Sequence, residues 1–323
     1  MKCQRWLAIS NVAAIVVAMI TACTPAAAPT TSGGDELSGT ISASGAFALY
    51  PLMVKWGEEF KKLHPNVNFD ISAGGAGKGM TDALSGQVDI GMVSRAISAD
   101  EEKKGAYWVG VVKDAVFPVV NANNPVIKDL QRKGISHAVF VDIFITGKIT
   151  TWGEVVGRPE IKDEIHVYTR SDSAGAADAW AKYLGKAQED LKGIGVSGDP
   201  AITDAVAKDP LGIGYNNLGY AYDAKTGQPV NGIVIPALDS NQNGQADDSE
   251  IVDTKAKAIA AVASGRYPAP PARALNVVTK GKPSGLVQAF ILWTLTDGQQ
   301  FVDSAGFIAL PEAVIDAGLQ KIK

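Results

Sequence analysis

A short polar stretch in the middle of the chain could bind an anion. Residues 170–176 read Arg-Ser-Asp-Ser-Ala-Gly-Ala, just after a β-like run that ends at Tyr168, and a helical pattern with Trp180 and Leu184 follows. A strand, a turn of small residues and a helix N-terminus direct free N–H groups and the helix dipole to one place. The adjacent arginine adds a planar charged fork that suits an oxyanion. The same stretch is also typical of an ordinary helix cap, where Ser and Asp are favoured.

Two earlier turns of small residues have similar surroundings. Residues 42–47 lie between a predicted strand and an amphipathic helix predicted over residues 49–63. Residues 73–79 follow a predicted strand at 67–71, and they lack the Gly-Lys-Ser/Thr ending of a P-loop. This alternation predicts an α/β domain with a parallel sheet, in which ligands bind at the carboxyl ends of the strands.

Composition excludes several classes of protein. The 323 residues are 46% hydrophobic and 20% charged, which is typical of a globular chain of about two domains. There are 30 Lys and Arg residues and 34 Asp and Glu residues, so the net charge is −4 and no nucleic-acid partner is expected. His64, His137 and His166 have neither metal-ligand spacing nor a serine partner in a nucleophile turn, so we do not expect an enzyme.

The N-terminus has the pattern of an export signal. Two basic residues precede a largely apolar run at residues 7–20, which is too short for a comfortable membrane span. The sequence Ile-Thr-Ala-Cys that follows resembles the bacterial lipobox, in which the cysteine is acylated. We therefore predict a lipoprotein signal peptide at residues 1–22, a lipid anchor on Cys23 and a flexible tether over residues 23–36. The alternative is a plain secretory signal in which Cys23 is incidental.

A second motif places oxygen ligands at fixed spacing. Residues 239–250 read Asp-Ser-Asn-Gln-Asn-Gly-Gln-Ala-Asp-Asp-Ser-Glu and match the EF-hand calcium-loop pattern. The predicted ligands are Asp239, Asn241, Asn243, Gln245 through its carbonyl, Asp247 and Glu250. Only the second flanking helix is evident, so we predict a structural Ca²⁺ held within the fold and not a pair of calcium-sensor loops. We predict no organic cofactor. A polar surface turn is the alternative.

Further short segments keep a common order along the chain. They are residues 44–47, 50–52, 55–56, 74–77, 88–95, 113–116, 143–152, 170–176, 212–215 and 278–281. Together they resemble the phosphate-binding proteins of bacterial and archaeal ABC transporters. The most specific segment is residues 143–152, Ile-Phe-Ile-Thr-Gly-Lys-Ile-Thr-Thr-Trp, and the resemblance covers roughly residues 37–310.

The resemblance implies an α/β, two-lobed periplasmic-binding-protein fold of type II. Each lobe would hold a mixed, mainly parallel sheet flanked by helices, and the ligand cleft between the lobes would close by a hinge motion. Lobe 1 would comprise residues 37–121 and 268–323, and lobe 2 residues 122–267 with the calcium-type loop. The family also implies an extracytoplasmic monomer, lipid-anchored to the cell membrane, that delivers phosphate to the membrane subunits of an ABC importer.

The resemblance further implies a site built from backbone N–H groups and hydroxyls. Carried over residue by residue, the ligand-binding set is Ser44, Ala46, Phe47, Ala76, Gly77, Lys78, Ser94, Arg95, Arg170, Ser173, Ala174, Gly175 and Ala176. Lys78 and Arg95 would raise the positive field. Asp172 would accept a hydrogen bond from the ligand or orient Arg170, whereas Asp89 is expected to have a structural role.

Alanine replaces the usual hydroxyl residue at four of these positions. They are residues 46, 76, 174 and 176. Backbone N–H groups can still donate, and a charged donor contributes about 1.5–3 kcal/mol against about 1 kcal/mol for a neutral one. Phosphate is therefore the expected ligand. Another oxyanion, a small organic anion or a non-transport sensing role are the alternatives.

Overall fold

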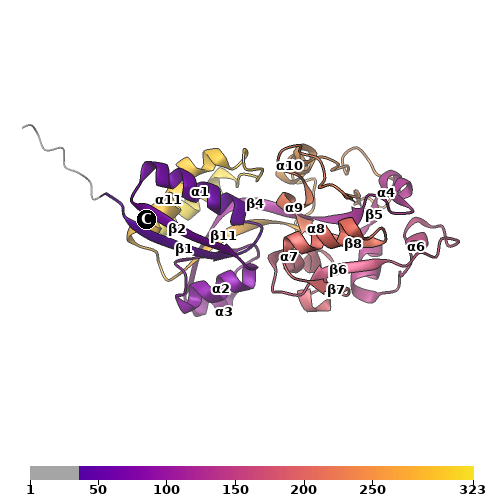
Figure 1. Ribbon diagram of the computed structural model, residues 1–323, viewed down its shortest axis with the longest axis horizontal. Helices are drawn as coiled ribbons and strands as arrows, with labels where there is room; N and C mark the ends of the chain where they lie inside the picture. The colour runs from indigo at the N-terminus through magenta and orange to yellow at the C-terminus, as the bar shows by residue number, and fades with distance from the viewer. Residues whose placement is uncertain (1–35) are drawn as a thin grey trace, which may run out of the picture. The chain divides into compact units, whose positions relative to one another are not determined.

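The computed structural model describes residues 36–323, and Figure 1 shows the order of its elements. The strands are β1 Gly39–Gly45, β2 Val67–Ala73, β3 Ile90–Val93, β4 Ala106–Asn121, β5 Ile135–Ser136, β6 His166–Arg170, β7 Ile194–Val196, β8 Gly212–Asn217, β9 Ile233–Val234, β10 Leu238–Asp239 and β11 Ala272–Lys280. The α-helices are α1 Tyr50–Leu63, α2 Ala76–Ser85, α3 Ala99–Lys103, α4 Ile127–Lys133, α5 His137–Val141, α6 Trp152–Val156, α7 Gly175–Tyr183, α8 Asp199–Lys208, α9 Leu218–Ala221, α10 Lys255–Ala263, α11 Gly285–Leu295 and α12 Glu312–Ile322. The predicted signal peptide, Cys23 and the tether up to residue 35 lie outside the described residues.

Two long strands connect two hydrophobic cores, which we call lobe 1 and lobe 2. Lobe 1 has Trp56 in its core, and lobe 2 has Trp180. The first part of β4 pairs antiparallel with β11, and its second part pairs antiparallel with β8 (Figure 1). β4 passes from the core of lobe 1 to that of lobe 2 between Val112 and Ala115, before residue 121, the predicted end of the first part of lobe 1. The strand-forming sequence of β4 continues without interruption from one lobe to the other, so residue 121 marks the end of the strand and not the boundary between the lobes.

Lobe 1 begins with an alternation of strand, turn and helix. β1 pairs in parallel with β2 on one side and with β3 on the other. The apolar residues of α1, spaced three or four apart, are buried, and they include Leu52, Trp56 and Phe60. Because carboxyl ends of parallel strands meet at one edge, the turns after β1, β2 and β3 lie together there.

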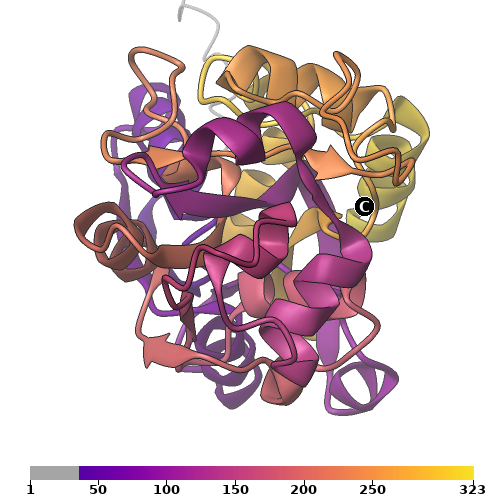
Figure 2. The ribbon, with the colours of Figure 1, turned by 90° about the vertical axis from the view of Figure 1, so that its right-hand side faces the viewer.

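Lobe 2 repeats this arrangement with β6 between β7 and β8, all parallel. Viewed from the right-hand side of Figure 1, helices lie above and below its strands (Figure 2). Phe140, Phe144, Trp180 and Tyr215 form an aromatic cluster with ring centroids 5.1–6.4 Å apart. The carboxyl ends of β6, β7 and β8 form the second edge from which ligand-binding turns extend.

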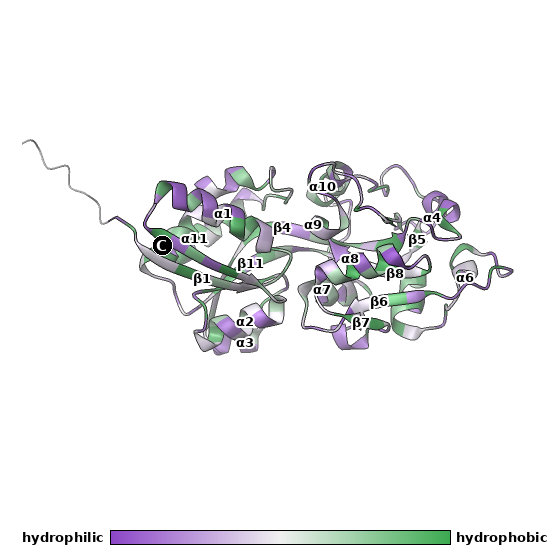
Figure 3. Ribbon diagram, in the orientation of Figure 1, coloured by the Kyte–Doolittle hydropathy of each residue, from purple (hydrophilic) through white to green (hydrophobic). Residues whose placement is uncertain are grey.

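Hydrophobic residues follow the strands and helices that pack inward. Figure 3 shows them along β1, β11 and α11. The apolar segment 139–145 forms α5 and a π-helical turn, Asp142–Thr146. Among the described residues, no helix is both long enough and apolar enough to cross a membrane.

Candidate anion-binding site

Arg170, the last residue of β6, is held in one orientation from several sides. Its N–H donates to the Tyr215 hydroxyl at 3.2 Å, and its guanidinium carbon lies 5.4 Å from the centre of the Phe47 ring. Nε donates to Asp172 at 2.8 Å, Nη2 pairs with the same carboxylate, and Nη1 pairs with Asp199. Only 2% of the side chain is exposed. The arginine is therefore a fixed, buried fork already shared by two carboxylates.

Asp199 is a site residue that the sequence argument did not find. It is the first residue of α8, after Gly198 with φ 87°, and its side chain is 1% exposed. The Asn217 amide donates to its second carboxylate oxygen. Burial raises the pKa of Asp199 to about 6, against the opposing effects of Arg170 and Asn217. Gly198-Asp199-Pro200 is one more small-residue turn between a strand and a helix, the signal that could have revealed it.

Two helices begin at the site without a side-chain cap. α2 follows Gly75, whose φ is 88°, and α7 follows Ala174; neither N-cap side chain accepts a hydrogen bond. Within residues 36–323, the backbone N–H groups of Phe47, Ala76, Gly175 and Ala176 donate to no other residue. Buried N–H groups without a partner cost stability, and helix N-termini attract negative charge. These four donors therefore suit an anion.

The donors surround one small cavity between the two lobes. Its volume is about 150 Å³, and its lining is Ala46, Phe47, Ala48, Gly75, Ala76, Ser94, Arg170, Ala174, Gly175, Ala176, Asp199 and Asn217. The lobes touch beside it, since the Gly77 N–H donates to the Ser173 carbonyl at 3.1 Å. The atoms that line it leave only a narrow space between them. The cavity therefore suits a small ion rather than an organic ligand of ordinary size.

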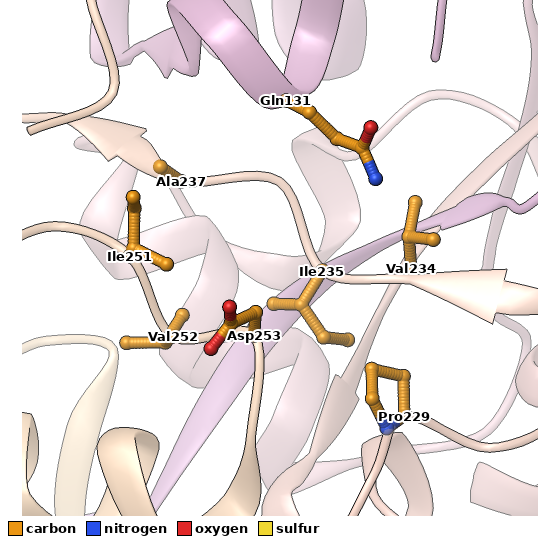
Figure 4. Close-up of a pocket in the computed structure, with 8 residues that line it drawn as sticks. All are labelled: Gln131, Pro229, Val234, Ile235, Ala237, Ile251, Val252 and Asp253. Atoms are coloured by element: carbon orange, nitrogen blue, oxygen red, sulfur yellow. The ribbon is translucent and has the colours of Figure 1, made fainter. Parts of the chain in front are cut away.

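A larger hollow in lobe 2 has the wrong chemistry for an anion. It measures about 770 Å³ and is lined by Gln131, Pro229, Val234, Ile235, Ala237, Ile251, Val252 and Asp253 (Figure 4). Asp253 is its one charged lining residue, and a carboxylate repels an anion. The smaller cavity, with its unpartnered donors, is the better anion site despite its size.

Comparison with known proteins identifies the family. A model of the PBP superfamily domain matches residues 30–298, most of the chain. The chain belongs to the PBP superfamily. The phosphate-binding protein PstS of Bacillus subtilis (strain 168) is 28% identical to it over 285 residues, covering 87% of this chain and 84% of the relative. PstS of Methanocaldococcus jannaschii is 27% identical over 344 residues, with coverage of 87% and 85%.

A solved structure shares the fold of this PBP-superfamily chain. A phosphate ABC transporter substrate-binding protein from Clostridium perfringens, crystallised with bound phosphate, aligns with a TM-score of 0.68 at 24% identity. The alignment covers 84% of this chain and all of the other. The predicted α/β, two-lobed periplasmic-binding fold is thereby confirmed.

The structure brings eight of the thirteen predicted ligand-binding residues together in the cavity lining. They are Ala46, Phe47, Ala76, Ser94, Arg170, Ala174, Gly175 and Ala176. As expected, all four alanines are among them and offer backbone groups only. Asp172 orients Arg170, and Asp89 accepts hydrogen bonds from the Ser42 N–H and hydroxyl at 2.8 and 2.7 Å, which connects β3 to β1.

The other five predicted residues lie outside the lining of this PBP-superfamily site. The Ser44 hydroxyl donates to Asp82 at 2.6 Å, and Lys78 pairs with the same carboxylate. Arg95 binds Glu101 through two hydrogen bonds of 2.7 and 2.9 Å. Gly77 and Ser173 contact each other beside the cavity, through the N–H and carbonyl given above. The expected extra positive field of Lys78 and Arg95 is therefore neutralised by Asp82 and Glu101.

The loop at residues 239–250 folds inward on its own carboxylates. Asp239 accepts hydrogen bonds from the N–H groups of Asn243 and Gly244, each at 3.1 Å, and Glu250 accepts from that of Ser240 at 2.7 Å. Gly244, with φ 73°, allows the turn. Across residues 36–323, however, no group of three or more His, Cys, Asp or Glu side chains is placed to hold a metal ion. Ca²⁺ at this loop stays a prediction.

Proposed function

We propose that this protein is an extracytoplasmic solute-binding protein that captures inorganic phosphate for an ABC importer. The observation that carries the proposal is a small cavity beside a fixed arginine, at which the backbone N–H groups of Phe47, Ala76, Gly175 and Ala176 donate to no residue in the described part of the chain. A tetrahedral oxyanion can accept from all of these donors at once. The curated relatives reported above are named as phosphate-binding proteins, which supports phosphate among oxyanions.

The cavity favours binding over catalysis. Its lining contains no His, Cys or Lys, and Ser94 supplies its one hydroxyl group. Asp199 is the one carboxyl group of the lining, no hydrogen bond among the described residues joins it to the Ser94 hydroxyl, and a serine that is not paired with a base is a weak nucleophile. The site therefore lacks the groups that would activate it for phosphate transfer, and we infer a role in capture and delivery to the membrane subunits of the importer.

Calorimetric titration of the mature protein tests the proposal. Phosphate, arsenate, sulfate, tungstate and small carboxylates are titrated in turn into protein dialysed free of anions. We expect phosphate to bind at sub-micromolar Kd and small carboxylates to bind far more weakly, because planar groups cannot reach donors around a tetrahedral site. Tight binding of sulfate or tungstate without phosphate binding would assign the same scaffold to another oxyanion.

We also propose export and lipid attachment through Cys23. The support is the sequence pattern of residues 1–23, a charged start, an apolar run and a terminal cysteine. Labelled palmitate should enter the wild-type protein in a bacterial host, and Cys23→Ser should abolish labelling and release the protein from the membrane fraction. Equal labelling of both proteins would contradict the anchor. We expect the exported protein to be monomeric in gel filtration.

We propose in addition that residues 239–250 hold a structural Ca²⁺. The donor set is entirely oxygen, from two Asp, one Glu, two Asn and one backbone carbonyl, which is what this hard cation prefers. Inward-facing Asp239 and Glu250 support the proposal. Bound Ca²⁺ would replace hydrogen bonds within the loop by shared coordination and so hold together the chain between β10 and α10.

A further inference from the structure

Five charged side chains form one network around the cavity. They are Arg170, Arg273, Asp114, Asp172 and Asp199. Arg273, on β11, lies 3.2 Å from Asp114 of β4, and it also donates to the Asn217 side-chain oxygen. The side-chain NH2 group of Asn217 donates to Asp199, which pairs with Arg170. Asn217 therefore connects the two ion-pair groups into one unit that spans both lobes.

The network carries an excess of negative charge before any ligand binds. With every group ionised, three carboxylates face two guanidinium groups, so the sum is −1. The most exposed of the five side chains, Asp172, is only 22% exposed, and Asp114 and Asp199 are each 1% exposed. Water therefore screens these charges weakly. Phosphate adds at least one more negative charge to this enclosed place, and this must be balanced.

Asp199 is the carboxyl group at which the balance can be made. It lines the cavity, whereas Asp114 and Asp172 do not. Its carboxylate accepts one hydrogen bond on each oxygen, from Arg170 and Asn217, and each oxygen keeps a further lone pair. Burial already raises its pKa to about 6, close to neutrality. An anion beside it disfavours the ionised form still more.

The other charged and titratable groups that face Asp199 do not reverse the effect of a bound anion, which is to favour the neutral carboxyl group. Arg170 of β6 and Arg273 of β11 favour its ionised form, and Asp114 of β4 disfavours it. Burial raises the pKa of Tyr215 of β8 to about 12 and also raises the pKa of Tyr220 of α9, so both hydroxyl groups are neutral near pH 7. Both arginines are already shared with carboxylates. Their positive charge is therefore already balanced by carboxylates, and the added charge of a bound phosphate is left to be balanced.

We propose that Asp199 binds a proton when the cavity takes up phosphate, so that the anion and one proton bind together. This inference rests on the proposed function. The proton comes from water or from dihydrogen phosphate, ends on a carboxyl oxygen of Asp199, and lets that group donate a hydrogen bond to a ligand oxygen. A group that repels the ligand in its ionised form becomes one more donor in its neutral form. Asp199 is thus a binding residue whose protonation sets the pH range of capture.

Proton counting by calorimetry tests this coupling. Phosphate is titrated into wild type and Asp199→Asn between pH 6 and pH 9, in buffers with different heats of ionisation. Asparagine imitates the neutral carboxyl group, so the variant removes the titration but keeps the shape. Relative to the variant, wild type should take up about one extra proton per phosphate at pH 8. Its affinity should fall up to tenfold more per pH unit above neutrality, the slope of one linked proton.

Asp172→Asn is the matched control, since it removes a carboxylate from the same arginine but from outside the lining. Whatever its phosphate affinity, its proton uptake at pH 8 should equal that of wild type. A purely structural role of Asp199 would weaken binding in Asp199→Asn equally at every pH.

A measurement on wild type alone covers the case in which Asp199→Asn does not fold. Phosphate addition at pH 8 should produce a protonated-carboxyl C=O band in the infrared difference spectrum. Phosphate binding without this band, or with equal proton uptake by wild type and Asp199→Asn, would overturn the coupling and leave the proposed function standing. Absence of phosphate binding to wild type would overturn both.

Discussion

The anion cavity offers mainly backbone groups, whereas the 239–250 loop offers mainly side chains. In the cavity, the free donors are backbone N–H groups, at Phe47, Ala76, Gly175 and Ala176, brought together from three distant turns. In the loop, the polar groups that turn inward are side-chain carboxylates within one short segment. A site made of backbone leaves few requirements on residue type, whereas a site made of side chains requires specific residues at fixed spacing.

Charge is also handled differently in the two regions. Arg170 is enclosed and shared by Asp172 and Asp199, so removing the arginine leaves two carboxylates without their shared cation. Most of the loop is open to solvent, and its carboxylates accept hydrogen bonds from backbone N–H groups of the loop itself. Substitutions should therefore act strongly at the cavity and weakly at the loop.

The largest effect is expected from Arg170→Ala. It removes the one cation that lines the cavity, and truncating one partner of a buried, hydrogen-bonded charge pair costs roughly 2–5 kcal/mol of binding free energy. Phosphate affinity measured by calorimetry should fall by at least about 25-fold, since each 1.4 kcal/mol is about tenfold. Arg95→Ala is the control, because Arg95 pairs with Glu101 away from the lining, and we expect less than a threefold change. Equal losses in both variants would remove the distinction between the two arginines.

A second test concerns contact between the lobes. A Cβ on Gly175 would lie 2.1 Å from the Ser94 hydroxyl oxygen and 2.5 Å from the Ser94 carbonyl oxygen, so Gly175→Ala must push the lobes apart. Overpacking of this kind costs roughly 1–3 kcal/mol, which corresponds to a loss of about 5- to 150-fold in phosphate affinity if the whole cost falls on the closed, ligand-bound state. Gly219→Ala is the control, as its added Cβ meets no atom within 4 Å. Unchanged phosphate binding by Gly175→Ala would show that this close approach is unnecessary.

The sequence predicted the fold better than the membership of the site. Strand, small-residue turn and helix recur in a pattern that local spacing reveals, and helix Tyr50–Leu63 begins and ends within one residue of its predicted limits. Lys78 and Arg95 looked suitable by charge and position in the chain. Asp82 lies one helical turn after Lys78, and Glu101, the partner of Arg95, belongs to the capping box at the start of α3. Whether such neighbours pair depends on the direction of their side chains. The small-residue turn before α8 marks Asp199 as a candidate, but only the pairing of β7 with β6 places that turn beside Arg170.

At the loop, calcium should stabilise the folded state without changing phosphate affinity. A ligand present at 100 times its Kd adds about 2.7 kcal/mol, so the Tm of lobe 2 should rise by several degrees with Ca²⁺ and fall with a chelator. Glu250→Gln should abolish the Ca²⁺ response by removing a charged pair of oxygens. Asp248→Asn, within the same loop but outside the predicted ligand set, should retain it. A Tm that ignores both Ca²⁺ and chelator in wild type would leave the loop as a polar surface turn.

The smallest expected effect adds a side-chain donor to a site made of backbone. Ala176 lines the cavity and is 2% exposed, so Ala176→Ser places a hydroxyl next to an N–H that already faces the ligand. One neutral hydrogen bond contributes about 1 kcal/mol, so phosphate affinity should rise about fivefold. Ala179→Ser, on the same helix and equally buried but outside the lining, should leave affinity unchanged. A gain would show that backbone donors leave recognition incomplete, whereas a loss would show that the cavity already fits its ion without room for another oxygen.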